Sequence, residues 1–351
     1  MKRIPAVTLF IGALSAGAFA SSSTAGRGPS AVVSGALRQA AGQRRAPTKK
    51  PAHPRKPGPS PALPCGDPFA FEVLLDRQKF SPGEIDGKLG TNASHAIAAL
   101  QAARGLEPTG DADCDTWHAL GGDTSGSMIA TYTIEKADVK GPFAKTIPAD
   151  LEKQASLPAL SYRSPLERLA ERFHVSPALL QRMNRRVAFK AGAAIQVPAV
   201  TPFDADAKPP KTPLEPDVTI QVTRDDSALR AIKADGTVIL FAPVTTGSEH
   251  DPLPPGNWKV TSVDWHPAFH YNPELFWDAD PKHSKATIKP GPNNPVGIVW
   301  IGLDLEHYGL HGTPEPSRIG YTESHGCVRL TNWDAARVAS IVKPGTPVVF
   351  R

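Results

Sequence analysis

Cysteine is scarce in this sequence of 351 residues, which has only Cys65, Cys114 and Cys327. The chain contains neither a C-x-x-C pair nor an H-E-x-x-H motif, and these spacings are typical of zinc sites. Several histidines between positions 307 and 325 lie near Cys327 in the sequence and could be read as zinc ligands with it. Their spacing disfavours that interpretation, so we expect no metal ion, and nothing in the sequence calls for an organic cofactor.

Long apolar runs are missing as well, except near the start of the chain. Lys2 and Arg3 precede an apolar run from Ala6 to Ala20 that ends in Ala-Phe-Ala. This pattern predicts a secretory signal peptide over residues 1–20, because a membrane-spanning helix needs about 20 apolar residues. No later stretch is as apolar, so we expect no integral membrane segment and a mature protein outside the cytoplasm.

Acidic residues are absent from residues 21–64, which are rich in Ser, Gly, Ala and Pro and carry eight Lys and Arg residues. Such a composition cannot bury enough apolar area to fold, and it predicts a disordered, basic, Pro-rich linker. Without these eight charges and the two of the signal peptide, the formal net charge changes from +5 to −5. The basic balance therefore belongs to the linker, and the folded part does not resemble a nucleic-acid-binding protein.

Cys65 and Cys114 bracket a short segment. In an oxidising compartment such a pair predicts a disulfide, which leaves Cys327 as a single thiol. Closing a loop of this length stabilises the folded state by about 4 kcal/mol in the chain-entropy model. The alternative is that all three cysteines are reduced.

Residues 65–123 carry the pattern of a small three-helix domain. Asp67-Pro68 is a helix start, a second helix ends at Gly105, and a third surrounds Trp117. The acidic residues of the segment 111–122 resemble a calcium loop, but its sixth position is Thr116 and its twelfth is Gly122. Because a calcium loop has Gly and Glu at these positions, we exclude calcium there.

Residues 124–200 contain a connector and a second small module. Ile129 to Ile134 is a short segment with strand propensity, and apolar spacing within residues 164–184 predicts two helices that close at Asn184. Ile195 to Pro198 then predicts a short strand.

Strand patterns dominate residues 215–351. Alternating apolar residues from Val218 to Val222, an Asp235-Gly236 hairpin turn and the apolar run Gly297 to Leu303 predict a mostly antiparallel β domain with one helix near its end. The long insert from His266 to Asn294 has two possible roles. One is a lid over the site. The other is packing of its aromatic side chains on the sheet, and this second outcome is the more common one.

The stretch from His311 to Asp334 carries the residues for nucleophilic chemistry. Cys327 is a candidate nucleophile, and His311 and His325 are both candidates for the base that deprotonates it. Gly326 leaves the sulfur accessible, and backbone N–H groups of such a turn can face an oxyanion. Thr331-x-x-Asp334 resembles a capping box that begins a helix behind the turn. The less specific alternative is two surface histidines and a buried apolar thiol.

The two segments His-Gly-Thr and Ser-His-Gly-Cys-Val-Arg-Leu resemble the active-site signature of the YkuD-type L,D-transpeptidases over residues 215–351. The resemblance implies a YkuD-like β-sandwich with one helix, in which Cys327 is acylated and His311 is its base. It also implies that the carbonyl of Gly312 orients His311 and that Arg329 contacts substrate. The supporting residues of the turn that the resemblance assigns to the substrate site are Ser324, His325 and Gly326.

Two shorter resemblances concern the preceding modules. The three helices and the Ile-Asp-Gly-Lys-Leu-Gly loop within residues 67–121 resemble the peptidoglycan-binding domain type 1. Residues 164–198 resemble a LysM module, but Ser161 to Pro165 stand where that module has its opening strand.

Together these resemblances imply an enzyme of cell-wall biogenesis in the periplasm or cell wall that acts on peptidoglycan stem peptides and glycan. Cys327 would form a thioester with a donor tetrapeptide, release D-Ala, and pass the acyl group to an amine. The alternatives are an L,D-carboxypeptidase or endopeptidase with the same nucleophile, and a non-catalytic wall-binding protein. The residues leave the oligomeric state and the acceptor amine open.

Overall fold

The computed structural model describes residues 63–215 and 217–351. The predicted signal peptide, residues 1–20, and almost all of the predicted linker, residues 21–64, lie outside this described part. In the part of the chain that is described, no helix is long and apolar enough to cross a membrane.

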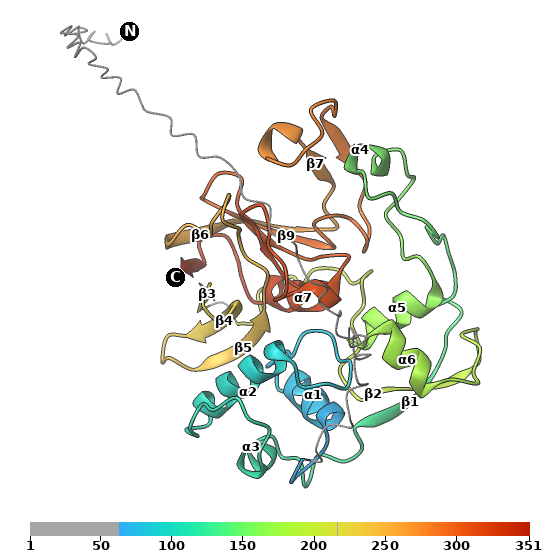
Figure 1. Cartoon of the computed structure of the whole chain (residues 1–351), viewed down its shortest axis with the longest axis vertical. Helices are drawn as coiled ribbons and strands as arrows, with labels where there is room; N and C mark the ends of the chain where they lie inside the picture. The colour runs from blue at the N-terminus through green and yellow to red at the C-terminus, as the bar shows by residue number, and fades with distance from the viewer. Residues whose placement is uncertain (1–62, 216) are drawn as a thin grey trace, which may run out of the picture. The chain divides into compact units, whose positions relative to one another are not determined.

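The first helical module has the three predicted helices (Figure 1). They are α1 (Pro68–Arg77), α2 (Thr91–Ala103) and α3 (Cys114–Ala119). The side chain of Asp67 accepts a hydrogen bond from the Ala70 N–H at the start of α1, and Asp113 caps α3 in the same way through Thr116. Cys65 and Cys114 form a disulfide with an S–S distance of 2.05 Å, which joins the segment before α1 to the first residue of α3.

The second module has the order strand, helix, helix, strand. Its elements are β1 (Ile129–Thr133), α5 (Pro165–Arg172), α6 (Pro177–Met183) and β2 (Ala194–Pro198). The two strands pair antiparallel, with Ile129 opposite Pro198. Residues 161–165 form no strand, and the strand that pairs with β2 lies further up the chain. The segment that separates β1 from α5 contains the short helix α4 (Leu151–Gln154).

The C-terminal part is built on one sheet of eight strands in the order β11-β10-β9-β6-β12-β3-β4-β5. The strands are β3 (Val218–Thr223), β4 (Ala228–Lys233), β5 (Val238–Pro243), β6 (Gly256–Trp265), β9 (Val299–Leu303), β10 (Gly309–His311), β11 (Val328–Arg329) and β12 (Pro347–Phe350). Only β10 with β11 and β12 with β3 are parallel neighbours, and the other pairs are antiparallel. The prediction of a mostly antiparallel β domain is confirmed.

The sheet curls at β6, which belongs to both of its halves. The first residues of β6 pair with β12, and the residues from Val260 onward pair with β9. The register shifts between Val260 and Ser262, and such irregularities bend a strand. The resemblance implied a β-sandwich of two sheets. The structure instead has one continuous sheet whose two halves face each other.

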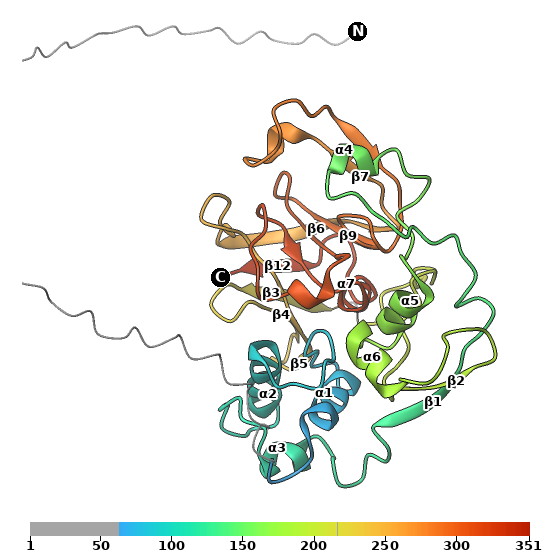
Figure 2. The same cartoon turned by 45° about the vertical axis from the view of Figure 1, so that its right-hand side comes forward.

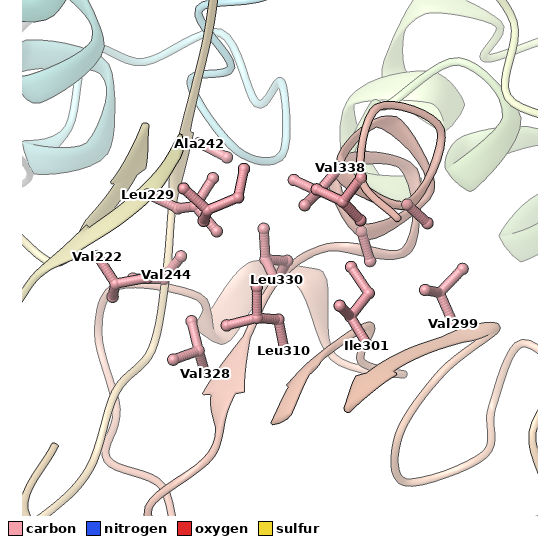
Figure 3. Close-up of a cluster of buried hydrophobic side chains, with 14 of the residues drawn as sticks. Val222, Leu229, Ala242, Val244, Val299, Ile301, Leu310, Val328, Leu330 and Val338 are labelled. Carbon is pink, nitrogen blue, oxygen red and sulfur yellow. The ribbon is translucent and has the colours of Figure 1, made fainter. Parts of the chain in front are cut away.

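The main apolar core lies between these halves (Figure 3). Val222 and Leu229 project from β3 and β4, and Leu310 and Val328 project from β10 and β11. Helix α7 (Asn332–Ala339) adds Val338 to the same core. Thr331 caps α7 by accepting a hydrogen bond from the Asp334 N–H, which confirms the predicted capping interaction.

The long insert forms a separate hairpin, which we call the flap (residues 269–288). It contains β7 (Phe269–Tyr271), the short helix η1 (Pro273–Leu275) and β8 (Ala286–Ile288), and β7 pairs with β8. Tyr271 and Ile288 pack on Leu160 of the connector, and Phe269 and Phe276 border the same small cluster. The expectation that the aromatic residues of the insert pack on the main sheet is wrong for these residues, although Trp265 does pack there.

A buried ionic cluster joins all three parts of the described chain. Arg337 of α7 donates to both carboxylate oxygens of Asp76 in α1, at 2.9 and 3.1 Å. His174, between α5 and α6, contacts the same carboxylate at 3.0 Å. Burial alone would raise the pKa of Asp76, but the charges of Arg337 and His174 hold that pKa well below its ordinary value. Asp76 is therefore ionised, and its charge is matched where three modules meet.

We expect Asp76→Asn to lower the free energy of unfolding by about 3 kcal/mol, at the low end of the range for a broken buried ion pair, because Arg337 loses one of its two carboxylate partners and keeps Asp334. Thermal unfolding of the full chain measures this effect. Asp111→Asn is the matched control, since Asp111 is an exposed carboxylate of the same module. Equal melting temperatures for the two variants would contradict the structural role of the cluster.

Candidate active site

The parallel pair β10 and β11 brings the predicted catalytic residues to one face of the sheet. His311 is the register partner of Arg329, and Leu310 is the partner of Val328. Leu310 and Val328 point into the core, so His311 and Arg329 point to the opposite face. Cys327 directly precedes β11, and extending the alternation of the strand by one residue would put Cys327 on the face of Arg329. It is offset from His311 by two residues of about 3.3 Å along the strand and one strand spacing of about 4.8 Å, which is within reach of the two side chains.

One hydrogen bond fixes the orientation of the His311 ring. Nδ1 lies 2.7 Å from the carbonyl oxygen of Gly312, and a carbonyl oxygen only accepts, so Nδ1 carries the proton. The ring stacks on Trp300 with centroids 5.5 Å apart, and only 4% of the residue is exposed. Burial, followed by the charge of Arg329, lowers the pKa of His311 to about 3. The ring is therefore neutral at neutral pH, and its Nε2 lone pair is free to accept a proton.

Asn332 supports the Gly312 backbone from behind. Its Oδ1 accepts a hydrogen bond from the Ile298 N–H, and its Nδ2 donates to Glu171 and to the carbonyl of Pro292. A Cβ atom on Gly312 would lie 2.2 Å from Asn332 Oδ1, which is closer than atoms can approach. Only glycine fits at position 312 while Asn332 keeps these contacts.

Cys327 is half-buried, and its thiol is not ionised at rest. Burial raises the pKa of the thiol, and the Gly309 N–H and the charge of Arg329 offset part of that effect. The sulfur contacts the carbonyl oxygen of His307 at 3.5 Å, as expected for a thiol that still carries its proton. The resting pair is a thiol and a neutral imidazole, which suits proton transfer during attack rather than a preformed ion pair.

The turn before Cys327 is held at both ends. Ser324 Oγ donates to the carbonyl of Cys327 at 2.6 Å, and the Ser324 N–H donates to the carbonyl of Gly247. Gly326 has φ of +101°, and a Cβ there would lie 2.9 Å from the Tyr308 ring. Within residues 63–215 and 217–351, no acceptor takes the N–H of Gly326 or Cys327. These N–H groups are available to an oxyanion next to the sulfur.

The two candidate bases have different surroundings, although Nδ1 of His325 also has no hydrogen-bond partner among the described residues. Nε2 of His325 lies 2.8 Å from Oδ1 of Asp278, and the ring packs against Phe276 and Trp277. His325 is thus engaged with the flap, whereas Nε2 of His311 remains free. Sequence reasoning identified the insert as a possible lid but missed Asp278, and it also missed the Trp300 stack. Both are contacts between distant segments with no local sequence signal.

The zinc interpretation gains no support from the geometry. Across residues 63–215 and 217–351, no three His, Cys, Asp or Glu side chains are grouped as metal ligands would be. The side chain of His307 is 58% exposed and pairs with Glu306, while His325 pairs with Asp278.

Comparisons with known proteins identify two domains. Residues 217–350 match the family model of the L,D-transpeptidase catalytic domain, and residues 70–120 match that of a putative peptidoglycan binding domain. These matches confirm both predicted resemblances. The resemblance of residues 164–198 to a LysM module stays a prediction.

Several curated proteins are similar to parts of the chain. Putative L,D-transpeptidase YkuD of Bacillus licheniformis is 48% identical over 60 residues, which are 17% of this chain and 36% of that protein. Putative L,D-transpeptidase YqjB of Bacillus subtilis is 29% identical over 146 residues, which are 40% of this chain and 74% of that protein. The chain thus spans only 36% of the length of the first of these relatives.

A solved L,D-transpeptidase from Mycobacterium smegmatis aligns with 47% of this chain and 76% of its own, at 18% identity and a TM-score of 0.32. A structural similarity at this TM-score carries no argument about the fold or the function of this chain.

The pH dependence of thiol alkylation tests the electrostatics of the pair. Iodoacetamide reacts with the thiolate, so we expect the alkylation rate of Cys327 to rise only above the ordinary thiol pKa of about 8.5. Arg329→Gln removes a cation that favours the thiolate, and it should move the profile to higher pH. Arg318→Gln is the control, because Arg318 is exposed and pairs with Glu315. Full alkylation of the wild-type thiol at pH 6 would contradict the neutral pair.

Proposed function

We propose that this chain is a peptidoglycan L,D-transpeptidase in which Cys327 is the nucleophile and His311 the base. The observation that carries the proposal is the hydrogen bond from His311 Nδ1 to the Gly312 carbonyl, with His311 paired in register to Arg329, two residues after Cys327. This bond leaves Nε2 as the one basic atom of a buried, neutral ring. The L,D-transpeptidase catalytic domain at residues 217–350 supports the same conclusion.

The first half-reaction forms a thioester. As Sγ of Cys327 attacks the carbonyl carbon of the third residue of a donor tetrapeptide, Nε2 of His311 takes the thiol proton. The tetrahedral oxyanion faces the N–H groups of Gly326 and Cys327. The intermediate collapses when His311 returns the proton to the leaving nitrogen, which releases D-Ala and leaves the acyl group on sulfur.

The second half-reaction transfers the acyl group to an amine of a neighbouring stem. The amine attacks the thioester carbon, His311 takes a proton from its nitrogen, and the intermediate expels the sulfur, which recovers a proton from His311. The bond energy of the donor peptide is kept in the thioester, so the reaction needs no nucleotide.

Arg329 is our candidate for binding a carboxylate of the stem peptide. It lies opposite His311 in the register of β10 and β11 and near the sulfur. Its planar donor fork suits a carboxylate, which would neutralise a cation that otherwise lowers the basicity of His311. Ser324 and Gly326 shape the turn beside this position.

The other parts of the chain fit an enzyme that works on the cell wall. We assign a signal peptide to residues 1–20, a linker to 21–64, a peptidoglycan-binding domain to 65–123, a connector and LysM-like module to 124–200, and the catalytic domain to 215–351. The strand, helix, helix, strand order of β1, α5, α6 and β2 supports the LysM-like assignment and a contact with glycan. Action in the periplasm or cell wall, with an effect on cell shape, follows from this arrangement.

Incubation with a disaccharide-tetrapeptide tests the proposal. We expect the wild-type protein to release D-Ala and to form cross-linked dimers, and we expect Cys327→Ala to do neither while it folds normally. Chromatography with mass spectrometry of the products measures both outcomes. Tripeptide without dimers would indicate an L,D-carboxypeptidase, and equal product from Cys327→Ala would contradict the assigned nucleophile.

A further inference from the structure

The tip of the flap carries an exposed aromatic surface beside the catalytic turn. Trp277 is 58% exposed, although tryptophan is usually largely buried. One face of its ring stacks on His250, with centroids 4.3 Å apart and planes 25° apart. The edge of the same side chain approaches His325, two residues before Cys327, at 5.7 Å between centroids. We call Trp277 and His250 the aromatic platform.

A pocket of about 470 Å³ adjoins the His250 side of this platform, and Trp277 itself does not line it. Its volume is within the range of about 300–1,000 Å³ that is usual for small-ligand sites. His250 is one of its lining residues, and prolines form much of its apolar wall. Its charged and polar groups include both donors and acceptors. They are Arg224, Asp225, Asp251, Tyr308 and Arg351.

Tyr308 connects this pocket to the nucleophile. The Tyr308 side chain lies against Gly326, so closely that a Cβ there would come within 2.9 Å of its ring. The same residue lines the pocket, so only one side chain separates the pocket from the turn that holds Cys327. Tyr308 thus contacts both the pocket and the turn.

We propose that the aromatic platform and this pocket bind a sugar ring of the glycan that carries the stem peptide. This inference rests on the proposed function and names which part of the substrate the site recognises beyond the peptide. The attacked carbonyl belongs to the third residue of the stem. Because an extended chain advances about 3.5 Å per residue, the sugar at the start of the stem lies about 10 Å from the sulfur.

The chemistry of the pocket fits a sugar better than it fits the stem itself. The C–H face of a sugar ring packs on the face of an aromatic ring, while its hydroxyl and acetamido groups both donate and accept hydrogen bonds. The pocket offers the imidazole of His250 together with two guanidinium and two carboxylate groups, and the indole of Trp277 lies next to it, stacked on His250. The side chains of a stem peptide are short or carry charges, and they offer no flat apolar surface to match Trp277.

The flap is held in place by the connector rather than by the main sheet. The Leu160 N–H donates to the carbonyl of Pro290, and the Ser284 N–H donates to Glu152. Tyr271 and Ile288 bury their side chains with Leu160. These contacts do not involve Cys327, His311 or Arg329, although the tip of the flap also contacts His325 of the catalytic turn.

The experiment compares two donors, a disaccharide-tetrapeptide and the sugar-free tetrapeptide, in steady-state assays of D-Ala release. Trp277→Ala should raise KM for the disaccharide donor about tenfold, which corresponds to about 1.4 kcal/mol of lost contact free energy. KM and kcat for the sugar-free donor should stay unchanged. His250→Ala should show the same selective loss, and the His250 ring stacks on Trp277 rather than on His325.

Leu275→Ala is the matched control, because Leu275 is an exposed apolar residue of the same flap that is not part of the aromatic platform. It should leave both donors unaffected. Equal losses on both donors in the Trp277 and His250 variants, or no loss on either, would overturn the sugar site while leaving the transpeptidase assignment intact. A wild-type protein that uses neither donor would overturn the proposed function together with this inference.

Discussion

The hydrogen bond between His311 Nδ1 and the carbonyl of Gly312 is the constraint on which the proposed chemistry depends. It assigns the proton to one nitrogen of the ring and leaves the other nitrogen as a base. A buried carboxylate would stabilise an imidazolium, whereas a backbone carbonyl beside a buried ring, with Arg329 close by, keeps the imidazole neutral. The thiol is held in its neutral form by the same kind of burial. In the proposed reaction, charge develops only when substrate is attacked, and the N–H groups of Gly326 and Cys327, which have no acceptor among the described residues, would receive it.

Helix α7 links this constraint to the rest of the molecule. Its first residue, Asn332, packs against Gly312 and bonds to Glu171 of α5. One turn further on, Asp334 accepts a hydrogen bond from Ser81, and Arg337 pairs with Asp76 of α1. The helix thus contacts the catalytic loop and both N-terminal modules. Figure 2 shows α7 between the sheet and helices α5 and α6. The modules that are candidates for wall binding are joined to the catalytic domain by buried polar contacts rather than by a free linker.

The sequence predicted the features that depend on neighbouring residues. The helix caps at Asp67 and Thr331, the alternation in β3, and the two His-Gly dipeptides are local patterns with a local physical cause. The features it did not predict are contacts between distant segments. Arg337 and Asp76 are 261 residues apart, and Asp278 and His325 are 47 residues apart. The strand β1 was assigned to no module, because a connector that contains α4 separates it from α5 in the sequence. Its antiparallel pairing with β2 shows that β1 and β2 belong to the same small sheet. The aromatic residues of the insert were expected on the sheet because nothing local indicates that Leu160 is their partner.

The protonation state of His311 is the most direct test of this account. Nitrogen NMR of the full-length protein, labelled at histidine and assigned with His311→Gln, reports each ring nitrogen separately. We predict a single neutral tautomer with the proton on Nδ1 between pH 5 and 8, because the pKa of His311 is lowered to about 3. An imidazolium signal for His311 at pH 7 would show a preformed thiolate and imidazolium pair, and it would contradict the proposed role of Gly312.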